Sequence, residues 1–155
     1  MNPTPHLHHP VIIESPFAGR GDRHSIRERD REDNIEYART AMRDSILRGE
    51  APFASHLLYT QDGILDDSIE AERKIGIACG AMWRQRALKT IFYTDREWSP
   101  GMIEALRYVL LHSMSFKLRS LHRTPQLPDG IWPVSVMRSL DTSPPSPFLF
   151  RNTTS

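Results

Sequence analysis

The fold is decided by the stretch from Ile91 to Met102, IFYTDREWSPGM. Its first residues are apolar and β-prone, as in a buried parallel strand, and the Ser99-Pro100 pair supplies an N-cap and a first-turn proline for a helix. The stretch from Val11 to Asp22, VIIESPFAGRGD, likewise runs from an apolar strand into a polar loop with proline and glycine. In an open parallel sheet such loops lie side by side at the carboxyl ends of the strands, where ligands bind. The sequence therefore predicts a pocket between these two loops.

Strand-like and helix-like patterns alternate along the rest of the chain. We expect strands at residues 11–13, 51–59, 90–94 and 115–121, and helices at residues 33–48, 67–86 and 99–112. This order, with short connections, predicts a parallel sheet that carries helices on its faces and right-handed crossovers. In the last strand apolar and polar residues alternate imperfectly, and we expect this strand at an edge of the sheet.

The chain divides by composition into three parts. Residues 1–10 form a polar, histidine-rich leader, residues 11–121 form the domain, and residues 122–155 form a proline-rich tail that cannot hold regular structure throughout. Apolar residues in the tail are expected to dock on the domain or on a neighbouring subunit: Trp132, Val134, Val136 and Met137.

Composition excludes several classes of function. The 155 residues suffice for one domain, and 39% hydrophobic and 25% charged residues are ordinary for a globular protein. A net charge of +1 argues against binding a nucleic acid polymer, and the longest apolar runs fall short of the roughly 20 residues that span a membrane. The single Cys79 is compatible with a reducing cytoplasm. His6, His8 and His9 have no carboxylate or thiol beside them, so we expect neither a metal site nor a cofactor.

The loop after the first strand is rich in arginine. Five arginines stand between Arg20 and Arg31, against Asp22, Glu28 and Asp30. Guanidinium groups bind phosphate in a bidentate manner, and glycines let backbone amides approach an anion, although a solvated and self-paired charge run explains the same pattern. There is no P-loop ending and no complete dinucleotide fingerprint. The candidate ligand-binding residues of this loop are Glu14, Ser15, Phe17, Gly19, Arg20 and Arg23.

Two further junctions carry candidate residues. At the end of the second strand, His56 and Tyr59 could offer a hydrogen-bond donor and an aromatic wall, although a packed histidine is an equal reading. At the third junction the amides that open the helix form a seat for a phosphate or for ribose hydroxyls. The candidates there are Asp95 and Glu104 for catalysis and Trp98, Ser99, Gly101 and Met102 for binding. Glu104 could equally be an ordinary first-turn acid, and Trp98 could simply cover the loop.

Four segments, in this order, resemble a set of small domains, mostly from phages and prophages, that are related to the nucleoside 2-deoxyribosyltransferases. The segments are Glu14–Phe17 (ESPF), Asn34–Arg39 (NIEYAR), Ala51–His56 (APFASH), and Tyr93–Asp95 followed by Ser99–Met102. The resemblance spans about residues 11–121. It implies a flavodoxin/Rossmann-like three-layer α/β fold with a small parallel sheet of four to five strands, and a nucleoside pocket at the strand ends.

In those transferases a glutamate on the helix after the third strand attacks the anomeric carbon, and an aspartate near the end of that strand assists the base. Asp95 stands where the resemblance places the aspartate. The position of the nucleophile is Ala105, and Glu104 comes one residue earlier, which turns it about 100° around the helix. A glutamate turned away in this manner cannot make the in-line approach that covalent catalysis needs.

Two classes of function follow. In the first, the protein binds a nucleotide or nucleotide-derived ligand without turnover, as a phage protein that sequesters a host immune signal in the host cytoplasm would. In the second, it is an enzyme that transfers or hydrolyses an N-glycosidic bond, with Glu104 or Glu14 as the carboxylate and Asp95 assisting. The alanine at position 105 favours binding. The resemblance also implies a homo-oligomer, and a third reading is an assembly protein whose tail around Trp132 makes the contact.

Overall fold

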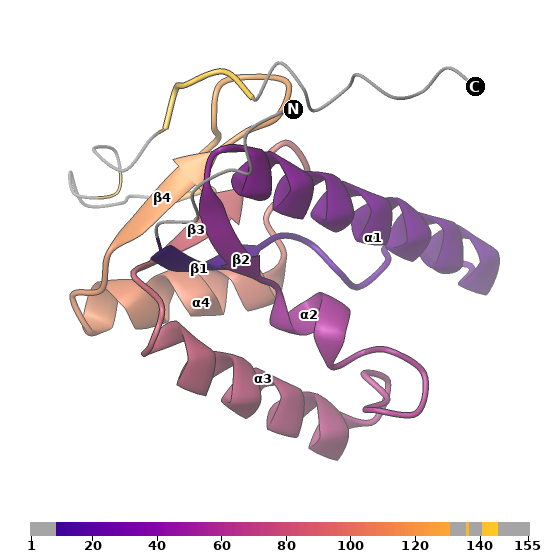
Figure 1. The fold of residues 1–155 in the computed structure, drawn as a ribbon. Helices are drawn as coiled ribbons and strands as arrows, with labels where there is room; N and C mark the ends of the chain where they lie inside the picture. Colours follow the sequence, from indigo (N-terminus) through magenta and orange to yellow (C-terminus); the bar gives the residue numbers. More distant parts are fainter. Residues whose placement is uncertain (1–8, 131–135, 137–140, 146–155) are drawn as a thin grey trace, which may run out of the picture.

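The computed structural model describes residues 9–130, 136 and 141–145 (Figure 1). Four strands form one sheet in the order β2-β1-β3-β4, and every neighbouring pair is parallel. The predicted α/β fold of the flavodoxin/Rossmann-like type is therefore confirmed, with four strands. The strands are β1 (His9–Glu14), β2 (Glu50–Phe53), β3 (Lys89–Tyr93) and β4 (Phe116–Arg119), and the helices are α1 (His24–Leu47), α2 (Ser55–Leu58), α3 (Glu70–Arg84) and α4 (Pro100–Leu111).

The sheet is covered on both faces (Figure 1). Successive strand residues point to opposite faces, so Ile91 and Tyr93 pack under α1 while Phe92 packs against Met102 and Leu106 of α4. Because both faces are covered, the central strands are apolar along their length instead of alternating with polar residues. This three-layer arrangement holds the carboxyl ends of all four strands at one edge.

The first helix begins earlier than expected. α1 starts at His24 instead of residue 33, so most of the arginine run is helical and not loop. Its first turns are mostly exposed, and Ile26 is their single apolar residue, so no apolar residues recur there at helical spacing. Arginine and glutamate are nevertheless good helix formers, and pairs such as His24 and Glu28, 3.3 Å apart, support the exposed turns.

The second strand is shorter than expected. β2 ends at Phe53, and the residues from Ser55 to Leu58 form the short helix α2 instead of continuing the strand. The amides of Leu57 and Leu58 donate to the carbonyl of Ala54, and this closes a helical turn. An apolar run of this length fits a strand or a helix equally well, so the pattern alone does not decide.

The predicted boundaries of the domain also shift. His9 and Pro10 belong to β1 and pair with Glu50 and Ala51, so the strand begins inside the expected leader. Val136 is fully buried against the α4 side of the sheet, which confirms the expected docking of that residue. The amide of Asp141 donates to Leu118 of β4 at 2.7 Å. Trp132, Val134 and Met137 lie outside the described residues.

Gly19 gives a direct test of how the first loop packs on α1. A Cβ built at Gly19 lies 1.7 Å from the carbonyl oxygen of Arg27, which is backbone and cannot move aside. We expect Gly19→Ala to lower the free energy of unfolding by about 2 kcal/mol or more, measured by urea denaturation. The control is Gly101→Ala, whose Cβ meets only Ser99 Oγ at 3.9 Å. Equal stability of the two variants would contradict this packing.

Candidate functional site

The loops after β1 and β3 lie together, as the sequence predicts. The strand order reverses between β1 and β3, which makes their carboxyl ends the switch point of the sheet. Arg20 in the first loop pairs with the carboxylate of Glu97 and donates to the carbonyl of Trp98 at 3.0 Å. Asp30 of α1 binds Arg96 at 2.6 Å. The candidate site is therefore the junction of these two loops at the carboxyl ends of β1 and β3, called the crevice below, and charged side chains close it.

Asp95 is buried and saturated with hydrogen bonds. Its carboxylate accepts from the hydroxyls of Tyr37 and Ser120 and from the amides of Leu121 and His122. A carboxylate has about four acceptor positions, and these donors use them. Burial raises the pKa of Asp95, but these hydrogen bonds outweigh it and hold the pKa below its ordinary value. The side chain fastens the loops and keeps no acceptor free for a leaving base.

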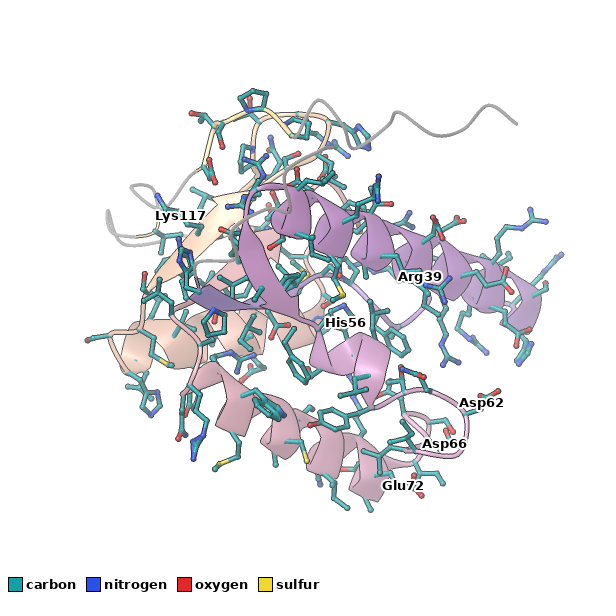
Figure 2. The ribbon with its side chains drawn as sticks, in the orientation of Figure 1. Arg39, His56, Asp62, Asp66, Glu72 and Lys117 are labelled. Carbon is teal, nitrogen blue, oxygen red and sulfur yellow. The ribbon has the colours of Figure 1, made fainter. Side chains whose placement is uncertain are left out.

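Ser15 and His56 meet at the ends of β1 and β2. Ser15 Oγ and His56 Nε2 are 2.9 Å apart, and the ring of Phe17 lies edge-on to the imidazole with centroids 6.1 Å apart. His56 comes from α2, where Figure 2 labels it. Burial lowers the pKa of His56 to about 4, so the imidazole is neutral at pH 7. A neutral imidazole can exchange a hydrogen bond with a ligand hydroxyl or base, but it cannot hold a phosphate by charge.

Glu14 is paired and not free. Its carboxylate binds the guanidinium of Arg84, which comes from α3 and lies over the ring of Tyr108 with 5.7 Å to the centroid. Burial raises the pKa of Glu14, although Arg84 opposes that shift. The Nε of Arg84 is buried and has no partner among the described atoms. Glu14 therefore holds α3 against the sheet under the crevice.

Three aromatic or apolar candidates serve packing. Trp98 stacks on Phe92 with ring centroids 5.4 Å apart, and its Nε1 donates to the carbonyl of Gln126 at 2.9 Å. The hydroxyl of Tyr59 accepts from Nε1 of Trp83 at 2.9 Å. Met102 is buried in the core beneath α4. Trp98 thus covers its loop, and Met102 does not reach the crevice.

The start of α4 has the predicted cap. Ser99 Oγ accepts from the amide of Met102 at 3.2 Å, and Gly101 is exposed with open space where a side chain would lie. Glu104 points into solvent and pairs with Arg107 at 2.7 Å. Ala105, at the expected nucleophile position, is buried in the core cluster beneath α4. The helix start stays accessible to a ligand, whereas neither residue 104 nor residue 105 faces the crevice as a free carboxylate.

The arginines between residues 20 and 31, in the first loop and the start of α1, divide into engaged and open groups. Arg27 donates to the carbonyls of Gly21 and Asp22, and Arg31 lies over the ring of Phe17 at 4.9 Å. Arg23 is the N-cap residue of α1 and is exposed. Arg29 is also exposed, and within the described part of the chain neither Arg23 nor Arg29 has a partner. Gly19, as shown above, is required by its contact with α1.

Two cavities lie near these residues, and neither is lined by residues of the loops after β1 and β3, between which the sequence predicts a pocket. One of about 80 Å³ is lined by His56, Tyr59 and residues of α3, and it is too small for a nucleotide. The other, about 370 Å³, lies along the first half of α1 and is lined by Ser25, Ile26, Arg29, Asp30 and Asp33. All five lining residues belong to this one helix and all but Asp30 are exposed, so the cavity is an open depression along α1. The same Asp30 joins this cavity to the contact between the two loops.

Sequence reasoning missed the residues that hold the candidates in place. Tyr37 and Ser120 bind Asp95, and Arg84 binds Glu14. Tyr37 stands in the NIEYAR segment, one of the four segments of the resemblance, and this membership is the sequence signal that could have identified it. Asn34, in the same segment, donates to the carbonyls of Phe17 and Ala18, and its Oδ1 is buried without a partner among the described atoms. Nothing marked Arg84, because its partner is far away in sequence.

The described residues contain no group of three or more histidine, cysteine or acidic side chains that could hold a metal ion. None of the helices in these ranges is both long and apolar enough to cross a membrane.

The family described as a domain of unknown function, DUF7768, matches residues 9–119. The match covers β1 through β4 and more than half of the chain. This chain belongs to the DUF7768 family. No curated protein and no solved structure matches the chain. The matched span contains the crevice and all the candidate residues of this DUF7768 domain.

The partly buried His56 makes the stability of the DUF7768 domain depend on pH. The unfolded chain takes up a proton near pH 6.5, whereas the folded chain resists it until about pH 4. The stabilising contribution is therefore fully present above pH 6.5 and is lost as the pH falls toward 4. Between pH 7 and pH 5 we expect a loss of about 1–2 kcal/mol that is absent in His56→Gln. Urea denaturation at both pH values measures it, and parallel losses in the two proteins would contradict a buried neutral imidazole.

Proposed function

We propose that this protein binds a nucleotide or nucleotide-derived ligand, without turnover, at the crevice between the loops after β1 and β3. The observation that carries the proposal is the meeting of these loops at the switch point of a parallel sheet, through Arg20 and the 96–98 segment. Ligands of such sheets bind at this place. Asp30, which lines the cavity along α1, also binds Arg96 of the loop after β3.

The state of the carboxylates favours binding over catalysis. Glu14 is neutralised by Arg84, and Asp95 has its acceptor positions filled. Glu104 is exposed and paired with Arg107. A nucleophile or general base needs a free lone pair directed at the reacting atom. The alternative, an N-glycosidic transferase or hydrolase, would need one of these side chains to leave its present partners.

The charge of the first loop indicates a phosphorylated ligand. Arg20 is 45% exposed and its partner Glu97 is 84% exposed, and ion pairs of this kind are worth only about 0–1 kcal/mol. A phosphate, which accepts a bidentate guanidinium fork, can displace Glu97 from Arg20. Arg23 and Arg29 add open positive charge nearby. An uncharged nucleoside would use none of these groups.

The biological setting that we propose follows from the resemblance given above. A phage protein that sequesters a nucleotide signal of host immunity in the host cytoplasm needs tight binding and no chemistry. A domain that keeps the crevice but engages its carboxylates elsewhere fits this requirement. The homo-oligomer implied by the resemblance is a separate question.

Arg20 and Glu97 should affect phosphate binding in opposite directions. By calorimetry against nucleoside mono-, di- and triphosphates and the matching nucleosides, Arg20→Ala should weaken phosphate binding about tenfold or more. Glu97→Gln should strengthen it, because the guanidinium no longer has a competing partner. Glu104→Gln removes a comparable exposed pair on α4 and should leave the affinity unchanged.

Chromatography for free base on the same samples separates the two classes of function. We expect no release of base from any nucleotide or nucleoside. Release that Glu104→Gln abolishes would establish the enzyme instead. Equal affinities in Arg20→Ala and the unmodified protein would contradict the phosphate site.

A further inference from the structure

A single carboxylate from α1 joins the two loops of the crevice. Asp30 Oδ2 accepts the backbone N–H of Arg20 at 2.8 Å, and Asp30 Oδ1 accepts from the guanidinium of Arg96 at 2.6 Å. The side chains of Asp30 and Arg96 are 26% and 32% exposed, so they are more sheltered from water than the pair of Arg20 with Glu97. The better shielded of these two ion pairs across the crevice is therefore the one that Asp30 makes.

The inward position of Asp30 is not explained by the packing of α1. Asp30 is the one residue from 21 to 33 that is not exposed. A helix segment surrounded by water gains nothing by turning an acid inward, because a sheltered carboxylate loses hydration and needs donors in its place. The donors of the two loops are therefore what holds this side chain inward.

The donors around Asp30 are those with which proteins bind phosphate, namely a backbone amide in a glycine-containing loop and a guanidinium. Arg20 stands between Gly19 and Gly21, and Gly21 has a φ of 125°, which residues with a side chain rarely adopt. Gly19 lies against the backbone of Arg27, so the loop is held close to the turn of α1 that carries Asp30. The fold thus directs two donors at one anionic position, and the Asp30 carboxylate fills it.

Glu97 fills a second anionic position. Its carboxylate pairs with the guanidinium of Arg20, which also donates to the carbonyl of Trp98 at 3.0 Å. The amide that binds Asp30 and the guanidinium that binds Glu97 belong to the same arginine. The two positions are therefore no farther apart than one arginine side chain and its hydrogen bonds, which is within the reach of one polyphosphate.

We propose that Asp30 and Glu97 occupy the positions of two linked phosphates of one ligand, and that the site takes a nucleoside di- or triphosphate in preference to a monophosphate. This rests on the function proposed above and extends it to the number of phosphates. An entering polyphosphate displaces both carboxylates, so that Arg20 and Arg96 exchange one anionic partner for another. Both acids can be released into water, because Glu97 is 84% exposed and Asp30 lies on an otherwise exposed stretch of helix.

Calorimetry with inorganic pyrophosphate and inorganic phosphate tests the two positions without a nucleotide. We expect pyrophosphate to bind the unmodified protein about tenfold more tightly than phosphate, and Arg96→Gln to abolish that preference. Arg107→Gln is the matched control, since Arg107 forms an exposed pair with Glu104 on α4, and it should retain the preference. Absence of pyrophosphate binding, or a preference that Arg96→Gln retains, would overturn the proposal.

Removal of the charge at Asp30 separates a residue that holds the place of a phosphate from one that only fastens the loops. Asp30→Asn should bind pyrophosphate about tenfold more tightly and should be less stable in urea, because the competing carboxylate also joins the loops. Glu32→Gln removes one charge from an exposed position about 200° around the same helix and should leave the affinity unchanged. An unchanged or weaker affinity in Asp30→Asn, or an equal gain in Glu32→Gln, would contradict the assignment.

Nucleoside mono- and diphosphates distinguish this inference from the proposed function. If pyrophosphate behaves as expected but no nucleoside diphosphate binds more tightly than pyrophosphate, the two anionic positions stand and the nucleotide function fails. If nucleoside mono- and diphosphates bind equally well and Asp30→Asn changes neither affinity, the nucleotide function stands and the second phosphate position is wrong.

Discussion

The carboxylate of Asp95 is the interaction on which the edge of the sheet depends. It joins Tyr37 of α1 to the turn after β4, formed by Ser120, Leu121 and His122, at the point where β3 ends. A buried carboxylate is costly unless donors replace its water, and here four donors do so. The loop after β3 is thereby fixed in position, and that loop carries both Glu97 and the start of α4. The same saturation that fixes the crevice removes Asp95 from chemistry.

The parts of the fold that sequence predicts are those with local signals. Apolar β-branched runs mark β1 and β3, and the Ser99-Pro100 pair marks the start of α4 through a cap that the structure contains. The first half of α1 has no such signal, because a helix that projects into solvent needs no apolar face. The sequence also gives no signal for α2, because its two leucines fit the continuation of the preceding strand.

The sequence predicts where the candidate site lies but not which side chains pair with one another there. Sheet topology brings the ends of β1 and β3 together whatever side chains they carry. Which carboxylate pairs with which guanidinium depends on contacts between distant parts of the chain. Glu14 pairs with Arg84 of α3, 70 positions away, and Arg20 pairs with Glu97, 77 positions away. An arginine-rich loop and an acid near a helix start therefore indicate an anion site from composition alone. The ion pairs that these side chains form in the fold decide how many of the charges stay free to bind an anion.

A buried charge network explains why the segment after the matched family region belongs to the fold. Arg119 of β4 binds Glu50 and Asp141, and burial of a guanidinium requires such partners. Arg48 binds Asp44 at 2.8 Å and donates to Ser143 and to the carbonyl of Pro144. The family match ends at residue 119, so Asp141 and Ser143 lie outside the matched region. Val136 is buried on the other face of the sheet, in the cluster with Phe92 and Leu118. The described residues beyond position 119 are therefore held on both faces of the sheet, by Arg119 and Arg48 on the α1 side and by apolar burial on the α4 side.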